Sequence, residues 1–213
     1  MNVQSFSYGP VGANMYVLTF GRRAVVIDPC CPWEETDVSP EIAVCAILCT
    51  HGHFDHISEA DSIVARFSCP LYISREDAAM LPDAELNHAS SFGMDISVRT
   101  TPHLLSGEEL SPKDLGLTDD EPFSLKVVPT PGHTAGSVCF LFDLGTDAKK
   151  IMFTGDMLFY GSVGRTDLGG SEEQMRMSIE RLRGMDDDIV CFPGHGSSTY
   201  LGKEKRYNPF FVK

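Results

Sequence analysis

The sequence predicts an α+β protein in which β-sheets pack together and helices lie on the outside. Short apolar runs of strand length recur along the chain, and only a few segments place apolar residues at helical spacing. The strands come in runs that a few helices interrupt, which is typical of packed sheets with helices outside. With 213 residues, of which 42% are hydrophobic, the chain can build a sizeable core, and we expect a single domain over residues 1–213.

The first half of the chain contains predicted strands and two predicted helices. Apolar runs predict four strands, the first two joined as a hairpin through Gly21 and Arg22: 15–20, 23–28, 42–50 and 70–74. Apolar residues recur at helical spacing in 57–67, which predicts an amphipathic helix. Ser74 and Asp77 resemble a capping box, so a second helix is expected over 75–81.

The second half begins with its least regular part. Residues 83–122 are rich in turn formers and acids, and we expect an irregular excursion over the surface. Four further apolar runs predict strands: 123–130, 137–144, 150–155 and 188–194. Ser171 and Gln174 form a capping-box pattern in front of a helix predicted over 172–184.

Charge and composition narrow the possible partners. The formal net charge is −13, and an acidic surface repels phosphate backbones, so we expect no nucleic-acid partner. No segment approaches the roughly 20 apolar residues that cross a membrane, and the N-terminus lacks the pattern of a secretion signal, so we expect a cytoplasmic protein. The adjacent Cys30 and Cys31 are either plain loop thiols or redox-sensitive thiols.

Side chains that bind metals follow directly on four of the predicted strands. The first strand of this kind leads into a cluster and each of the other three into a single residue: His51, His53, Asp55 and His56, then His133, Asp156 and His195. If the strands lie side by side, their ends fall along one rim and the side chains converge. A lone histidine is more often a cap or a surface residue than a ligand, but the combined pattern favours a metal site.

The number of candidate ligands indicates two metal ions. Seven residues exceed the three or four that one catalytic zinc needs, and they fit two divalent ions that share one carboxylate. Imidazole and carboxylate together suit zinc, iron or manganese, and ligand identity alone does not choose among them; we expect zinc. In an extended segment His51, His53 and Asp55 share a face, and a helix that starts near Ile57 is expected to turn Asp55 and His56 toward the second ion.

These motifs resemble those of the metallo-β-lactamase superfamily. The matching stretches are "THGHFDH", "PGHT", "TGDMLF" and "FPGHG", in this order over nearly the whole chain. The resemblance implies a four-layer αβ/βα sandwich of the metallo-β-lactamase type, with the metal site at one sheet edge. It also implies a ligand set for each metal and a bridge: His51, His53 and His133 for the first, Asp55, His56 and His195 for the second, and Asp156 between them.

Other stretches resemble the glyoxalase II-like hydrolases, which cleave hydroxyacylglutathione thioesters. These stretches are "ELNHASSFG", "LFYGSVGRTDLGG" and "PGHGSSTYLGKEKRYNPF". The resemblance implies that Asp28 supports a ligand imidazole from behind. Arg165 has two interpretations: it meets an anionic part of the substrate, or it pairs with Asp167 and braces the loop that holds Asp156, which is the interpretation we favour.

The expected function is a binuclear metal-dependent hydrolase acting on a small-molecule thioester. A hydroxide that bridges the two metals attacks the thioester carbonyl, and Asp55 is expected to orient the hydroxide or to shuttle its proton. One alternative is a mononuclear iron persulfide dioxygenase, with His51, His133 and Asp156 as ligands. The other is a metal-binding protein without enzymatic activity. The sequence leaves the native substrate, the metal and the oligomeric state open.

Overall fold

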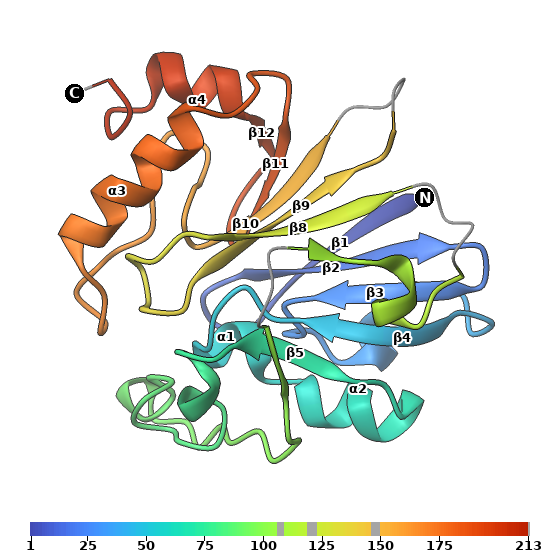
Figure 1. Ribbon diagram of the computed structural model, residues 1–213. Helices are drawn as coiled ribbons and strands as arrows, with labels where there is room; N and C mark the ends of the chain where they lie inside the picture. The colour runs from blue at the N-terminus through green and yellow to red at the C-terminus, as the bar shows by residue number, and fades with distance from the viewer. Residues whose placement is uncertain (106–108, 119–122, 146–149, 213) are drawn as a thin grey trace.

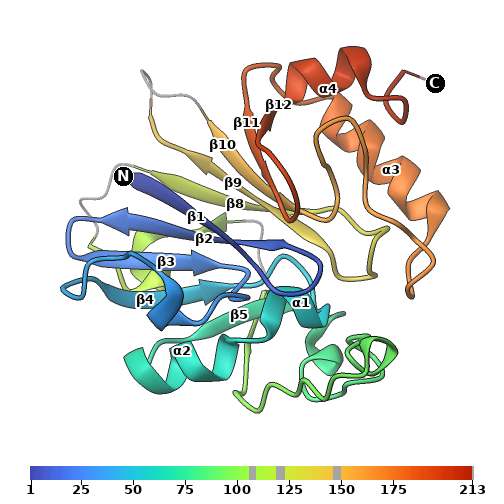
Figure 2. The same ribbon diagram turned by 180° about the vertical axis from the view of Figure 1, so that it is seen from behind.

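Two β-sheets lie face to face in the computed structural model, and helices cover their outer surfaces (Figures 1 and 2). The structure describes residues 1–105, 109–118, 123–145 and 150–212. Within these residues each sheet has six strands, in the orders β1-β2-β3-β4-β5-β6 and β12-β11-β10-β9-β8-β7. Helices α1 and α2 pack on the outside of the first sheet, and α3 and α4 on the outside of the second. This is the four-layer α+β sandwich that the sequence predicts.

The first sheet is built from the N-terminal half of the chain. Its strands are β1 (Asn2–Tyr8), β2 (Ala13–Phe20), β3 (Arg23–Ile27), β4 (Ala43–Leu48), β5 (Leu71–Ser74) and β6 (His103–Leu105). The second sheet comprises β7 (Glu109–Leu110), β8 (Ser124–Pro129), β9 (Val138–Asp143), β10 (Ile151–Gly155), β11 (Val190–Pro193) and β12 (Thr199–Tyr200). The helices are α1 (Phe54–Ile57), α2 (Ala60–Phe67), α3 (Glu172–Arg183) and α4 (Leu201–Tyr207).

The core fills the space between the sheets and the space under each helix layer. Strand β9 contributes to two of these spaces, because Phe140 and Phe142 face the central core while Cys139 packs under the helices of the second sheet. This follows from the period of two along a strand. Phe140, Phe142 and Phe153 are fully buried, and burying a side chain of this size contributes roughly 1.5–3 kcal/mol. The two sheets are therefore held together mainly by aromatic and aliphatic packing.

Strand directions bring the ends of four strands to one edge of the sandwich. Strands β8 and β10 are both antiparallel to β9, and β10 is parallel to β11, so these three strands of the second sheet run in one direction. The segments after them carry His133, Asp156 and His195. In the first sheet β4 is parallel to both β3 and β5, and the segment after β4 carries His51 and His53. The convergence expected from the sequence thus has a topological cause.

Several sequence predictions for the strands are confirmed. The hairpin β2–β3 is antiparallel and turns at Gly21, whose φ is +58°. The strands expected after it correspond to β4, β5, β8, β9, β10 and β11. Ser171 accepts a hydrogen bond from the Gln174 backbone N–H at the start of α3, as the capping pattern predicted.

The helix predictions of the first half need correction. The helix expected over 57–67 is broken into α1 and α2, and α1 begins at Phe54 instead of near Ile57. The helix expected over 75–81 is only a short 3-10 turn, Ala78–Met80. Half of the predicted capping box forms, because the Asp77 backbone N–H donates to Ser74 Oγ at 3.3 Å. The other half does not form, because the Asp77 carboxylate accepts hydrogen bonds from distant segments instead of from the start of a helix.

The excursion at 83–122 is less irregular than expected. It supplies an edge strand to each sheet, β6 and β7, and a capped 3-10 turn, Pro112–Leu115. Residues 106–108 and 119–122 of this segment lie outside the described residues. Strand β1 and helix α4 were not predicted from the sequence. No helix in the described ranges has the length and apolar character needed to cross a membrane.

Candidate metal centre

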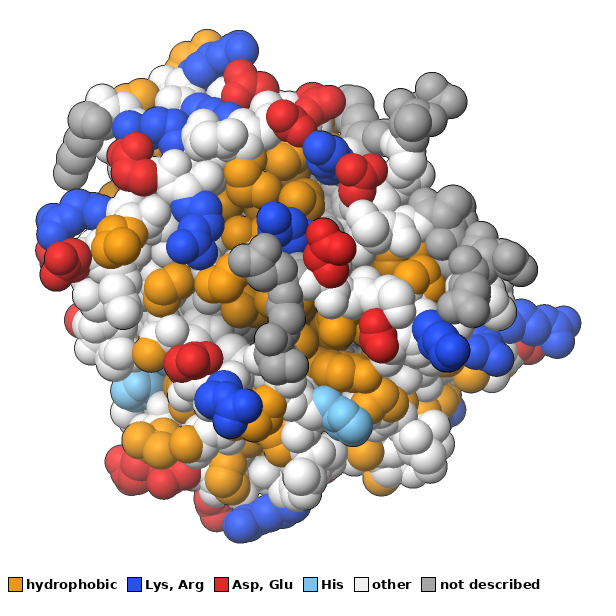
Figure 3. Space-filling model, in the orientation of Figure 1, with side chains coloured by type: hydrophobic (Ala, Val, Ile, Leu, Met, Phe, Trp, Pro, Cys, Tyr) orange, Lys and Arg blue, Asp and Glu red, His pale blue; other side chains and the backbone are white. Residues whose placement is uncertain are grey.

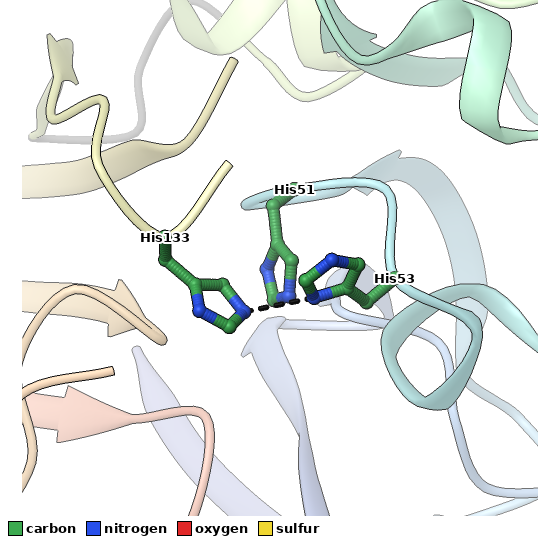
Figure 4. A group of neighbouring side chains, drawn as sticks. All are labelled: His51, His53 and His133. Carbon is green, nitrogen blue, oxygen red and sulfur yellow. Dashed lines mark hydrogen bonds between the residues drawn. The ribbon is translucent and has the colours of Figure 1, made fainter. Parts of the chain in front are cut away.

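Three histidines from two loops converge at the edge of the sandwich. His51 and His53 follow β4, His133 follows β8, and one ring nitrogen from each lies within 4.8 Å of the other two. Figure 4 shows the three rings turned toward one another. The shortest approach, between Nδ1 of His53 and Nε2 of His133, is 2.8 Å. We call this set the imidazole group.

Two histidines of the imidazole group, His51 and His53, have the protonation state that a metal requires. Burial, and then the neighbouring histidines, lower the pKa of His51 well below 6.5. Burial and His133 lower the pKa of His53 to about 3. The buried Nε2 atoms of His51 and His53 have no hydrogen-bond partner among the described residues. Buried neutral imidazoles with unpartnered nitrogens are costly alone, and a divalent cation would satisfy them.

A second set lies beside the first and contains a carboxylate. Asp55 and His56 are both on α1, and His195 follows β11; their ligand atoms also lie within 4.8 Å of one another. His195 Nε2 is 3.3 Å and His56 Nε2 is 3.6 Å from Asp55 Oδ2. We call this set the mixed group. Because α1 starts at Phe54, it is the helix itself that presents Asp55 and His56, and not a turn before it.

The carboxylates reverse the direction of the histidine pKa shifts in the mixed group. Burial acts to lower the pKa of His56, but Asp55, Asp156 and Asp28 raise it well above 6.5. Burial is likewise outweighed at His195, whose pKa is raised by its hydrogen bond to Asp55 and by Asp156. In the metal-free protein His56 therefore carries a proton at neutral pH, and a cation bound here must displace it.

Asp156 lies between the two groups. Its carboxylate oxygens are 3.4 Å from His133 Nε2, 3.3 Å from His56 Nε2 and 3.6 Å from His195 Nε2. Burial acts to raise its pKa, but His56, His133 and His195 together lower it well below its ordinary value. An ionised carboxylate in contact with both groups is what a bridge between two ions requires. The structure thus brings all seven predicted residues together, and their binding of metal stays a prediction.

Hydrogen bonds from behind fix the orientation of these imidazoles. His56 Nδ1 donates to Asp28 Oδ2 at 2.9 Å, and the same carboxylate accepts from the backbone N–H and the hydroxyl of Thr50. His133 Nδ1 donates to the Arg165 carbonyl at 2.7 Å. These contacts leave the Nε2 atoms of both rings facing the site. Asp28 therefore occupies the position expected of a supporting carboxylate.

Asp77 is a residue whose role the sequence analysis missed. It is 1% exposed and accepts hydrogen bonds from Gly52 N at 3.1 Å, Thr134 Oγ1 at 2.6 Å and Gly136 N at 2.8 Å. Gly52 lies between His51 and His53, and Thr134 follows His133, so one carboxylate joins the two loops of the imidazole group. The position of Asp77 in the sequence was a signal for this role, because Asp77 follows β5, and β5 runs parallel to β4, the strand that precedes His51 and His53.

The N-terminal hairpin holds the loop of His195. Tyr16 donates its hydroxyl hydrogen to the Pro193 carbonyl at 2.7 Å, and Asn14 Nδ2 donates to the carbonyls of Pro193 and Gly196. This loop contains Gly194, and a larger residue would not fit there, because a Cβ atom would be 2.2 Å from Asp156 Oδ1. The close approach of the loop to the site thus requires glycine.

The groups open into a pocket of about 410 Å³. Its walls include Val11, Phe54, Phe92, Phe159 and Leu168, and Arg165 lines it as well. Arg165 makes two hydrogen bonds of 2.6 Å to Asp167, and both side chains are exposed. The pairing is the one that the bracing interpretation expects.

The two histidines outside the predicted ligand set differ in position. His88, whose φ is +66°, packs edge-on against His53 with ring centroids 5.2 Å apart and lines the pocket. His103 lies on the edge strand β6 against Tyr72. Only His88 is therefore near the candidate metal centre.

Comparisons with known proteins show the family of the chain. The model of the family described as the Metallo-beta-lactamase superfamily matches residues 8–195. The chain is 33% identical over 208 residues to a probable metallo-hydrolase, YqgX, of Bacillus subtilis, covering 95% of this chain and 93% of the relative. It is 34% identical over 179 residues to the hydroxyacylglutathione hydrolase GloC of Haemophilus influenzae, covering 83% of this chain and 78% of the relative.

Two solved structures are similar over nearly the whole chain. The BLEG-1 B3 metallo-beta-lactamase is 32% identical with a TM-score of 0.87, and the match covers 100% of both chains. TTHA1623, solved in a di-iron-bound form, is 31% identical with a TM-score of 0.82, and the match covers 98% of this chain and 100% of that one.

Proposed function

The chain belongs to the metallo-beta-lactamase superfamily and is a metal-dependent hydrolase of it, and we propose that it cleaves thioesters of the hydroxyacylglutathione type. The observation that carries the proposal is the position of Asp156, whose carboxylate contacts both the imidazole group and the mixed group. Such an arrangement fits two divalent ions held side by side by His51, His53, His133, Asp55, His56, His195 and Asp156.

The ions would supply a water of lowered pKa and an electrophile for the thioester carbonyl. The residues of the chain position this chemistry. Asp55 is held ionised, because His56 and His195 lower its pKa against the effect of burial. A carboxylate oxygen of Asp55 is therefore available to accept a hydrogen bond from the attacking water and to hold its proton.

A thioester suits this site because its leaving group needs little help. A thiol has a pKa near 8.5, so a thiolate departs at neutral pH without a strong general acid. The apolar walls of the pocket, including Phe54, Phe92 and Phe159, fit the carbon skeleton of an acyl group. The relative named hydroxyacylglutathione hydrolase supports the same substrate class.

The metal and the compartment are part of the proposal. We propose zinc as the resident ion, with iron or manganese as alternatives; iron has support from the related protein solved in a di-iron form. We place the protein in the cytoplasm because its seven cysteines are free thiols, whereas exported proteins commonly pair theirs.

The test combines metal analysis with turnover on one sample. Freshly purified protein is expected to contain two ions per chain and to release thiol from S-D-lactoylglutathione. Removal of the ions with a chelator should abolish release, and returning Zn²⁺, Fe²⁺ or Mn²⁺ in separate samples should restore it. Loaded protein that releases no thiol from any thioester would refute the proposal.

Three other outcomes identify the rivals. One iron per chain with oxygen uptake on glutathione persulfide would identify a dioxygenase. Faster opening of a β-lactam ring than of any thioester would identify a β-lactamase, the activity named for the related BLEG-1 structure. Full metal occupancy without turnover of any of these substrates would identify a metal-binding protein without enzymatic activity.

A further inference from the structure

We propose that His88 recognises the 2-hydroxyl group of the acyl portion of the substrate through a hydrogen bond, and so selects hydroxyacyl thioesters over simple acyl thioesters. The proposal rests on the thioesterase function proposed above and adds a residue that determines specificity. His88 lies outside the predicted ligand set, and its imidazole lines the metal pocket.

The backbone of His88 has a conformation that L-residues rarely adopt. Its φ is +66°, and among the described residues other than glycine only Asp28 and Ser68 also have a positive φ. Ser68 ends helix α2, where a left-handed residue is common, and Asp28 supports His56 in the metal centre. Left-handed residues without such an ordinary explanation are uncommon and cluster at functional sites. His88 is therefore a candidate for a functional role.

The residues on either side hold His88 in this conformation. Asn87 and Ala89 are both fully buried. The Asn87 carbonyl accepts a hydrogen bond of 3.0 Å from the N–H of Phe54, the first residue of α1. The side-chain amide of Asn87 donates to the Ile96 carbonyl at 2.9 Å, and Figures 1 and 2 show the green segment between β5 and β6 beside α1. The position of His88 is thus fixed relative to the helix that carries two of the predicted ligands.

The imidazole of His88 reaches from this segment into the metal pocket. It packs edge-on against His53, with ring centroids 5.2 Å apart. It also lies against the segment 163–170, because a Cβ atom at Gly169 would be 3.9 Å from His88 Nε2. On the face drawn in Figure 3, histidine surface is confined to small patches, which fits a chain that keeps most of its imidazoles inside the site. The ring of His88 therefore forms part of the pocket wall directly beside a predicted ligand.

His88 is the polar side chain of this wall that is left without a partner. Most of the polar residues that line the metal pocket are predicted ligands: His53, Asp55, His133, Asp156 and His195. Arg165, which is not a predicted ligand, is paired with Asp167. The hydroxyl of Ser162 donates to the Val163 carbonyl. Among the described residues, none forms a hydrogen bond with the ring nitrogens of His88, so they are available to a substrate.

A hydroxyl group on the substrate suits these nitrogens. A neutral imidazole has one donor and one acceptor nitrogen, and a hydroxyl can both donate and accept, so either tautomer of His88 can form the bond. The apolar part of the wall includes Phe54, Phe92 and Phe159, and pockets of this kind orient a ligand through a few polar groups. The 2-hydroxyl is on the carbon next to the reacting carbonyl and enters the pocket with it. An acyl group without the hydroxyl would leave the buried polar group unpaired, which disfavours that substrate.

Two thioesters that differ by one hydroxyl test the proposal. S-D-lactoylglutathione and S-propionylglutathione have the same thiol and the same number of acyl carbons, so the ratio of their kcat/KM values measures recognition of the hydroxyl. His88→Met should lower this ratio about tenfold in the zinc-loaded protein, because it removes one hydrogen bond between neutral groups. His88→Gln is the matched variant, since Gln has nearly the shape of Met but can still form the bond, and it should retain most of the ratio.

Two further variants control for position and for the backbone. His103→Met, on the edge strand β6 outside the metal pocket, should keep the wild-type ratio. Glycine adopts the left-handed conformation without steric cost, so His88→Gly should lose the ratio as His88→Met does and unfold at a temperature no lower than the wild type. An unchanged ratio together with a lower unfolding temperature would show that the imidazole only supports the fold, and would overturn the proposal.

Binding of the acid products gives a measurement without turnover. D-Lactate should bind the zinc-loaded protein more tightly than propionate, and His88→Met should reduce the ratio of the two dissociation constants about tenfold, as measured by calorimetry. Zinc content is measured on the same samples. If His88→Met loses zinc and lowers both kcat/KM values equally, His88 acts through His53 and the proposal is wrong.

The outcomes separate this proposal from the proposed function. If the protein hydrolyses both thioesters and His88→Met keeps the wild-type ratio, His88 does not recognise the hydroxyl, even though the protein is a thioesterase. If the loaded protein hydrolyses neither thioester but prefers D-lactate to propionate in a manner that depends on His88, the proposed reaction is wrong and the recognition of the hydroxyl stands.

Discussion

The two halves of the metal centre are suited to a cation for different physical reasons. The imidazole group is buried, and burial depresses the pKa values of His51 and His53, which are therefore neutral. The mixed group is more open, with 25% of the His195 side chain exposed, and carboxylates hold its histidines in a state that favours a proton. The first half is thus prepared for a cation by desolvation, and the second by negative charge. Two ions should therefore bind with different affinity and different pH dependence.

The largest effect is expected from replacing Asp156, the residue that contacts both halves. Asp156→Asn should lose both ions and lower kcat/KM for a thioester by about 10³-fold or more, since one removed electrostatic contact already costs 10²–10³. Metal content and thiol release measure the two effects. Asp186→Asn, a surface carboxylate paired with Lys150, is the control and should change neither. Normal turnover by Asp156→Asn would contradict the assignment of the site.

A variant of Asp77 should act on one half only. An amide has one acceptor oxygen and would turn its NH2 toward one of the three groups that donate to Asp77. Asp77→Asn should therefore weaken the ion of the imidazole group about 10- to 100-fold, the range found for supporting residues. Stepwise zinc titration against a chelator measures this, and His133→Ala and His195→Ala identify which step belongs to which group.

The neighbouring Glu76→Gln is the matched control for Asp77→Asn, because Glu76 is exposed. It should leave both zinc affinities as in the wild type. Equal weakening of both ions by Asp77→Asn would show that this carboxylate supports the fold in general and does not act on the imidazole group in particular.

The pH dependence of zinc binding should sharpen the difference between the halves. At pH 7 His51 and His53 are neutral, so the ion of the imidazole group displaces no proton from them. His56 is protonated, because its pKa is raised well above 6.5, so the ion of the mixed group displaces at least one proton. Below the pKa of His56, the affinity for this ion should fall about tenfold per pH unit, and it should fall more steeply than the affinity for the other ion.

Calorimetry in buffers of different ionisation enthalpy counts these protons for each binding step. The His195→Ala variant, which retains the imidazole group, should release fewer protons than the wild type, because His51 and His53 are already neutral. Release of the same number of protons in both steps would show that the two groups do not differ in protonation.

The smallest expected effect concerns the support of the mixed group by the N-terminal hairpin. Tyr16→Phe removes the hydrogen bond from the Tyr16 hydroxyl to the Pro193 carbonyl and the bond of 3.3 Å that the hydroxyl accepts from Asn14 Nδ2, but Asn14 still donates to that carbonyl. The free energy of unfolding should fall by about 1 kcal/mol, as measured by urea denaturation. Tyr207→Phe, at a side chain that is 74% exposed, is the control and should unfold at the wild-type urea concentration. A loss above about 3 kcal/mol would indicate a role beyond these hydrogen bonds.

Most of the site could be predicted because its residues occur in short motifs after apolar strands. His51, His133 and His195 each follow such a strand, and the pattern of side chains there is local. The break between α1 and α2 could not be predicted, because the apolar spacing continues across it. Asp77 was misinterpreted because its partners, Gly52, Thr134 and Gly136, are remote in the sequence, and a capping pattern cannot compete with three hydrogen bonds in a buried site.

The sequence by itself determined the kind of fold and the identity of the candidate ligands, since strand periodicity and residue type are properties of short segments. The resemblance of the motifs implied which ligands share a group and that Asp156 lies between the groups, whereas only the tertiary structure decided the distances between them and the hydrogen bonds by which Asp77 joins two loops. Those relations depend on strand direction and on the packing of one sheet against the other. The tertiary structure also decided the protonation states of His51 and His56, because the pKa of a histidine depends on its burial and on its charged neighbours.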